Sequence, residues 1–136
     1  MARALAVLLA ASCATSAAAL TTQQSTPGIA YEVFCKLPDA ESKRAAFVST
    51  TAENQAELVR TQVERWRDAS HARLNAKQLE FLKELIAFIT PQAYAGSRSD
   101  DVRTKQRDFA ARQRTLFSAS DLQAMQPNGP CIGKVR

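Results

Sequence analysis

Apolar residues recur at steps of three and four along most of this chain, and no segment of any length alternates with the two-residue period of a β-strand. The spacing is clearest between residues 52 and 70, where Ala56, Val59, Val63 and Trp66 follow one another. These side chains form one stripe along a helix, and we interpret Trp66 as a core anchor rather than an exposed binding residue. The pattern predicts an all-α fold, a small bundle of about four to six amphipathic helices.

Capping signals predict where the helices begin. Thr50 and Glu53 have the spacing of a capping box ahead of this stripe, and Asn75 and Gln78 have it ahead of the next apolar segment. In a capping box, side chains satisfy backbone amides that the first helical turn leaves without a partner. Three further helices are predicted to start near Pro38, Ser99 and Ser118.

The predicted helices differ in how much apolar surface they carry. The helix that Asn75 opens has the widest apolar arc, from Leu79 to Ile89, so we expect it to pack on two sides and to lie at the centre. The helix after Ser99 has a thinner stripe and is expected at the periphery. Nearer the N-terminus, the residues predicted to be buried are Ile29, Val33, Leu37, Phe47 and Val48.

The N-terminus predicts export. Arg3 is followed by an uninterrupted apolar run over residues 4–11 and by a small-residue stretch that ends at Ala17-Ala18-Ala19. A basic start, a short apolar run and an A-x-A site mark a cleaved signal peptide, and the run is shorter than the ~20 apolar residues of a membrane-spanning helix. The mature chain is therefore expected to have no transmembrane helix. The predicted division is a signal peptide (1–19), a disordered lead-in (20–30) and a helical domain (31–136).

Cys13 offers an alternative processing site. Residues 10–13 are similar to a bacterial lipoprotein box, in which the cysteine becomes lipidated, although Ala10 replaces the usual leucine. The chain is thus predicted to be secreted or periplasmic, with a membrane-anchored lipoprotein through Cys13 as the alternative.

Cleavage at either site leaves Cys35 and Cys131 as the natural disulfide partners, because Cys13 is either removed or lipidated. In an oxidising compartment two remaining thiols are expected to pair, whereas two free thiols are the alternative. The bridge would close almost the whole domain, which in the chain-entropy model stabilises the fold by ~4–5 kcal/mol.

The chain offers few residues for catalysis or cofactor binding. P-loop, G-x-S-x-G and G-x-G-x-x-G motifs are absent, and we expect no cofactor, no metal site and no enzymatic activity. The single histidine, His71, follows Asp68 by three residues, and we interpret it as a solvated side chain near a helix end rather than as a general base. A formal net charge of +5 is small for a dedicated nucleic-acid binder, so no nucleic-acid partner is expected.

Three arginines, Arg103, Arg107 and Arg114, fall on one edge of the helix predicted after Ser99. One interpretation is a contact surface for an anionic partner, including weak association with membrane head groups. The other interpretation is that the arginine stems lie along the edge of the core and hold their charged ends in water.

Several short phrases of the sequence resemble the bacteriocin fulvocin C-related family of bacterial exported proteins, over roughly residues 31–126. The phrases include residues 37–38, 44–47, 57–60, 63–65, 74–78, 89–94 and 117–118. Members of that family are largely of unknown activity. The resemblance therefore implies export and bacteriocin-related ancestry, but no specific activity. This chain differs from a bacteriocin because it lacks a cysteine-rich C-terminal peptide, and Cys131 stands alone near the end.

Residues 74–78 are also similar to the LTxxQ motif of Spy-type periplasmic chaperones, with Asn75 in place of the threonine. Taken together, the sequence predicts an exported helical protein that acts by binding a protein or peptide partner. A Spy-like chaperone is the first alternative, and a hydrolase that uses His71 is the second.

Overall fold

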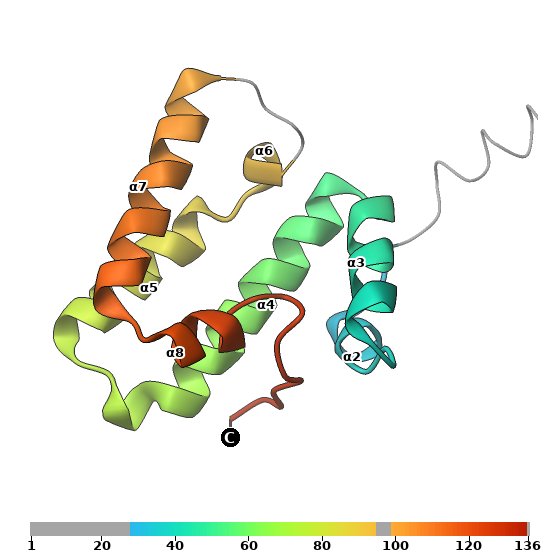
Figure 1. Cartoon of the computed structure of the whole chain (residues 1–136), viewed down its shortest axis with the longest axis horizontal. Coiled ribbons are helices and arrows are strands. Elements are labelled where there is room, and N and C mark those ends of the chain that lie inside the picture. The colour runs from blue at the N-terminus through green and yellow to red at the C-terminus, as the bar shows by residue number, and fades with distance from the viewer. Residues whose placement is uncertain (1–27, 95–98, 136) are drawn as a thin grey trace, which may run out of the picture.

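The computed structural model describes residues 28–94 and 99–135, and in these ranges the backbone forms helices and no strand (Figure 1). The elements are α2 (Tyr31–Cys35), α3 (Ala40–Ser49), α4 (Ala52–Ser70), the 3-10 turn η1 (His71–Arg73), α5 (Ala76–Phe88), α6 (Pro91–Tyr94), α7 (Asp100–Leu116) and α8 (Ala119–Ala124). The predicted all-α fold is confirmed. No helix in the described ranges combines the length and the apolar character needed to cross a membrane.

The longest helix, α4, lies at the centre and contacts α2, α5 and α6. In Figure 1, α5 and α7 stand on one side of α4, and α2 and α3 stand on the other. The helix after Asn75, α5, packs on two sides as predicted, against α4 and α7, but the expectation that it would be central is wrong. α4 is central because it has a second row of buried residues, Asn54, Leu58 and Gln62. Two of these three residues are polar, so a search for apolar spacing does not detect the row.

The main core lies between α4, α5 and the end of α7. Trp66 and Phe117 meet edge to face with ring centroids 5.6 Å apart, and the buried ring of Phe81 lies 5.9 Å from Phe117. Such aromatic contacts add specific stabilisation to the burial of apolar area. The interpretation of Trp66 as a core anchor is confirmed, and α7 has no buried residue within its bounds, as its peripheral position predicts.

A smaller apolar cluster joins α2 to α4 through Tyr31, Phe34 and Leu58. Val33 and Val48, which the sequence predicts to be buried, are instead 58% and 65% exposed. Val33 faces outward because Tyr31 and Phe34, three residues apart, share the helix face that packs on α4. The other residues predicted to be buried here are half-buried against this cluster: Ile29, Leu37 and Phe47.

Side-chain caps mark the beginnings of α3, α4, α5, α7 and α8, whereas α2 begins without one. Asn75 and Gln78 form the predicted capping box at α5, with both hydrogen bonds 2.9 Å long. At α4 the cap is Thr51 and not the predicted Thr50, because Thr50 still ends α3. The other side-chain caps are Asp39 of α3, Ser99 of α7 and Ser118 of α8.

A disulfide joins Cys35, at the end of α2, to Cys131 in the C-terminal segment, 96 residues further along the chain. The predicted pairing is confirmed. Because disulfides persist in oxidising compartments, the bridge agrees with a chain that leaves the cytoplasm. The predicted signal peptide, with Cys13, lies outside the described residues.

Candidate functional site

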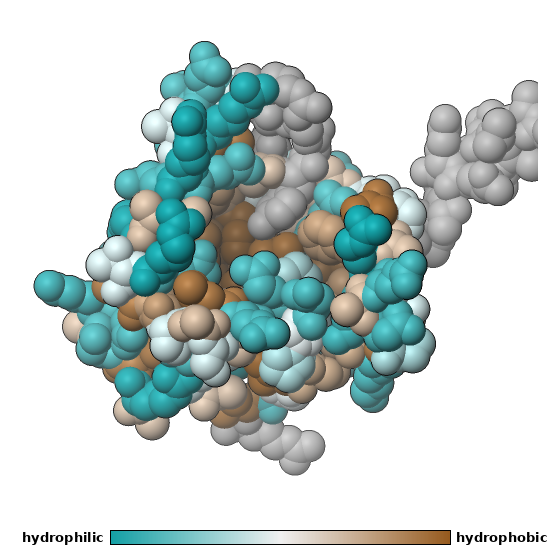
Figure 2. Space-filling view, viewed as in Figure 1, coloured by the Kyte–Doolittle hydropathy of each residue, from teal (hydrophilic) through white to brown (hydrophobic). Residues whose placement is uncertain are grey.

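A cavity of about 310 Å³ lies between α4, α5 and α7, and the C-terminal segment closes one side of it. Figure 2 shows a hollow with hydrophobic side chains at its bottom, beside the hydrophilic outer surface of α7. Most of the lining side chains are apolar, among them Val59, Val63, Leu85, Phe88, Ile89, Phe109 and Met125. Small-molecule sites in proteins begin at about 300 Å³, so the cavity has room for a small apolar ligand.

The cavity forms where α7 packs on α5 and α6 rather than closely on α4. Phe88 of α5 stacks on Phe109 of α7 with ring centroids 4.8 Å apart and an interplanar angle of 27°. Phe81 contacts Phe109 at 5.8 Å. These contacts hold α7 against α5, so this wall of the cavity exists without a ligand.

Glutamines supply the polar part of the lining. The Gln106 amide donates a hydrogen bond to the carbonyl of Ala93 (2.9 Å), and the Gln113 amide donates one to the sulfur of Met125 (3.7 Å). None of the described residues that line the cavity is charged. An uncharged, mostly apolar lining favours hydrocarbon and disfavours a buried charge.

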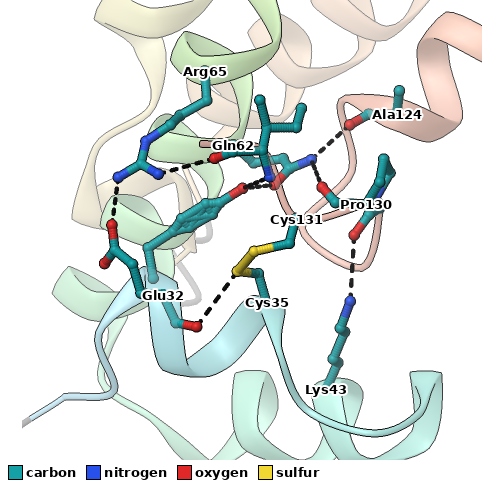
Figure 3. Close-up of a disulfide and its surroundings, with 11 residues drawn as sticks. Glu32, Cys35, Lys43, Gln62, Arg65, Ala124, Pro130 and Cys131 are labelled. Atoms are coloured by element: carbon teal, nitrogen blue, oxygen red, sulfur yellow. Dashed lines mark hydrogen bonds and ion pairs between the residues drawn. A yellow bond between two sulfur atoms is a disulfide. The ribbon is translucent and has the colours of Figure 1, made fainter. Parts of the chain in front are cut away.

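The C-terminal segment contributes residues 126–127 to the cavity wall and is held at several points (Figure 3). The ammonium group of Lys43 donates to the carbonyl of Gly129 (3.3 Å), and the Gln62 amide donates to the carbonyl of Pro130 (3.0 Å). The disulfide follows directly after these contacts. The wall is therefore fastened to α2, α3 and α4.

Arg103, Arg107 and Arg114, the predicted contact for an anionic partner, are all exposed on α7. At about 100° per residue they lie within about 60° of Ala110 around the helix axis, and Ala110 lines the cavity. The helical spacing therefore places the three arginines beside the cavity, next to its lining residue Ala110, and we refer to them as the arginine rim. In the described part of the chain, none of them forms an ion pair.

Arg112 lies on the opposite edge of α7 and is fully engaged. Its guanidinium pairs with Glu84 of α5 at 2.5 Å and with Asp108 at 3.5 Å, and it lies 5.6 Å from the ring centroid of Phe109. The hydrogen bond with Glu84 raises the pKa of Arg112 above its ordinary value. Arg112 thus fastens α7 to α5, and sequence analysis did not single it out because its main partner is 28 residues away.

The candidates for other chemistry lie away from the cavity. His71 is exposed at the end of α4, which agrees with its interpretation as a solvated side chain, and Asp68 pairs with Arg67 at 3.0 Å. Within the ranges that the structure describes, no three His, Cys, Asp or Glu side chains are grouped so that they could hold a metal ion.

No protein-family model, curated protein or solved structure matches this chain. The resemblances to fulvocin C-related proteins and to Spy-type chaperones therefore stay predictions from the sequence. The function has to be inferred from the cavity and its rim.

The sequence singled out several cavity residues, but as ordinary core. Phe88 and Phe109 belong to predicted apolar stripes, and the structure places both at the cavity wall, half-buried. The sequence feature that could have indicated the cavity is the pair Gln106 and Gln113, two amide side chains within the apolar stripe of α7. Polar residues at positions of an apolar stripe indicate that this face of the helix is not fully buried in the core.

Proposed function

We propose that this chain is an exported binding protein, and that the cavity between α4, α5 and α7 takes the apolar part of its ligand. The observation that carries the proposal is the cavity itself, about 310 Å³ with an uncharged and largely apolar lining. Burial of hydrocarbon in such a space is favourable by roughly 25 cal/mol per Å² of apolar surface removed from water. The disulfide supports export.

Binding is preferred to catalysis because the lining offers no acid–base pair and no nucleophile. Its polar side chains are the amides of Gln106, Gln113 and Gln126, and an amide is neither a nucleophile nor an acid–base group. Turnover of a peptidoglycan, ester or peptide substrate by the purified exported protein would contradict the proposal.

A fluorescent apolar probe tests it. N-phenylnaphthylamine is uncharged and becomes fluorescent when it leaves water, so we expect saturable fluorescence with the exported protein. Ala110→Phe places a ring in the cavity from α7 and is expected to weaken binding about tenfold or more, because the ring occupies space that the probe needs. Ala111→Phe is the matched control, since Ala111 is an exposed residue of the same helix that does not line the cavity.

Two results would contradict the proposal. One is the absence of saturable probe binding, and the other is equal binding by the Ala110→Phe and Ala111→Phe variants. A Spy-like chaperone would instead suppress aggregation of an unfolded client at equimolar amounts, with the same effect from wild type and Ala110→Phe.

A further inference from the structure

The cavity has an apolar interior and a cationic rim, and from this pairing we propose that its ligand is a single-chain anionic amphiphile. The hydrocarbon chain occupies the cavity, and the anionic head group lies on Arg103, Arg107 and Arg114. This inference rests on the proposed function and adds the chemical class of the ligand.

The interior determines where the head group lies. Because the described lining is uncharged and largely apolar, a charged group placed inside would lose its hydration and find no opposite charge to compensate. An amphiphile therefore enters with its chain inside and its head group at the rim. The volume of about 310 Å³ is at the small end of ligand sites, which favours one chain rather than two.

The rim determines the sign of the head group. Three exposed guanidinium groups lie along the cavity side of α7, and no carboxylate in the described part of the chain pairs with them. Guanidinium groups bind carboxylate and phosphate through paired hydrogen bonds, and they repel a cationic head group. Figure 2 shows hydrophilic side chains along α7 directly beside the hydrophobic hollow, so one ligand can contact both.

The opposite edge of α7 does not offer the same contact. Arg112 is held by Glu84 and Asp108 there, and Asp101 adds a further carboxylate. On the arginine edge, three guanidinium groups that form no ion pair within the described residues outnumber the one carboxylate, Asp100, so an anionic head group is favoured there over the opposite edge.

Titration calorimetry with free dodecanoate, below its micelle concentration, tests the inference. We expect dodecanoate to bind with a stoichiometry of one, and dodecyltrimethylammonium, which has the same chain and the opposite charge, to bind at least about tenfold more weakly. The triple variant Arg103→Gln, Arg107→Gln and Arg114→Gln is expected to lose about tenfold in affinity for dodecanoate, since it removes three exposed charge contacts that are each weak. Its affinity for uncharged N-phenylnaphthylamine should not change.

A second triple variant controls for net charge. Arg44→Gln, Lys77→Gln and Lys105→Gln remove the same charge from exposed positions that do not line the cavity. This variant should bind dodecanoate as wild type does at about 0.15 M salt, where charges more than about 8 Å apart are screened.

The failures of the two proposals differ. If the exported protein binds N-phenylnaphthylamine but does not prefer dodecanoate to the ammonium amphiphile, or if the arginine variant keeps full affinity for dodecanoate, the ligand class is wrong and the cavity proposal stands. If Ala110→Phe leaves dodecanoate binding intact, the amphiphile lies on the helix surface and the inference is overturned. If wild type binds neither probe, both proposals fail.

Discussion

The hydroxyl of Tyr31 donates a hydrogen bond to the side-chain oxygen of Gln62, which joins α2 to the middle of α4 inside the fold (Figure 3). The amide nitrogen of Gln62 donates in turn to the carbonyls of Ala124 (2.7 Å) and Pro130 (3.0 Å). Gln62 is 1% exposed, so one buried amide connects the N-terminal helix, the central helix and the C-terminal segment. That segment is also a wall of the cavity.

Replacing Gln62 with leucine is expected to destabilise the fold strongly. The change leaves the Tyr31 hydroxyl and two carbonyl groups without this partner, and each buried unsatisfied polar group costs about 1–3 kcal/mol. We predict a loss of about 3 kcal/mol or more in the free energy of unfolding, measured by urea denaturation. Gln123→Leu, at an exposed position of α8, should stay within about 0.5 kcal/mol of wild type. Equal effects of the two substitutions would contradict this role of Gln62.

Gly129 is required for the turn that leads into the disulfide. A Cβ atom at this position would lie 2.9 Å from three carbonyl oxygens, those of Gln123, Ala124 and Gln126. Because backbone atoms cannot yield as a flexible side chain does, we predict that Gly129→Ala lowers the free energy of unfolding by about 1–3 kcal/mol. Gly133→Ala provides the matched control, since a Cβ there meets nothing within 4 Å. If Gly129→Ala leaves the free energy of unfolding unchanged in thermal or urea unfolding, this turn is not as tight as described.

How much of the fold could be predicted depended on whether the signal was local. The capping box of Asn75 and Gln78 was predictable because both partners lie within one helical turn. The cap of α4 was missed by one residue because Thr50 and Thr51 are neighbours of the same type, and only the end of α3 decides between them. The disulfide was predictable because the predicted removal or lipidation of Cys13 leaves Cys35 and Cys131 as the two partners.

The features that depend on packing between distant segments were not predictable. Asn54 and Gln62 are buried through partners far away in the chain, and an apolar pattern counts both as surface. The cavity depends on α7 packing against α5 and α6, a geometry that no helical period encodes. The sequence did single out the three arginines of α7, but their place on the rim became visible only once the cavity was known.

The ion pair between Arg73 of η1 and Asp121 of α8 should make stability depend on pH. The side-chain hydrogen bond from Arg73 lowers the pKa of Asp121 below its ordinary value of 3.8. A carboxyl group whose pKa is lower in the folded state stabilises the fold above its unfolded pKa, and this contribution is lost as the pH falls through the folded value. We therefore predict that Asp121→Asn lowers the free energy of unfolding at neutral pH. The decrease should be at most about 1 kcal/mol, because Arg73 is half-exposed and solvent screens the ion pair. At a pH below 3.8, the ordinary pKa of the carboxyl group, the decrease should be smaller.

A double-mutant cycle checks this prediction. The coupling energy between Asp121→Asn and Arg73→Gln, measured by urea unfolding, should be favourable at neutral pH and should shrink in acid. A coupling energy that is the same at both pH values would contradict the assignment of this pH dependence to the ion pair.

Export makes a prediction about the covalent form of the protein. Intact-mass spectrometry of protein recovered outside the cytoplasm should show a chain that begins at Leu20, with two hydrogens missing because Cys35 and Cys131 are joined. A lipid adduct on Cys13 would instead support the lipoprotein alternative. Recovery of the full-length, reduced chain from the cell interior would contradict export.

The most direct test of the cavity as a ligand site is nuclear magnetic resonance of the exported protein with dodecanoate. Ligand binding in the cavity predicts nuclear Overhauser contacts between the methylene protons of the ligand and the ring protons of Phe88 and Phe109, which line it. Contacts only with side chains outside the cavity, or none at saturating dodecanoate, would contradict the account.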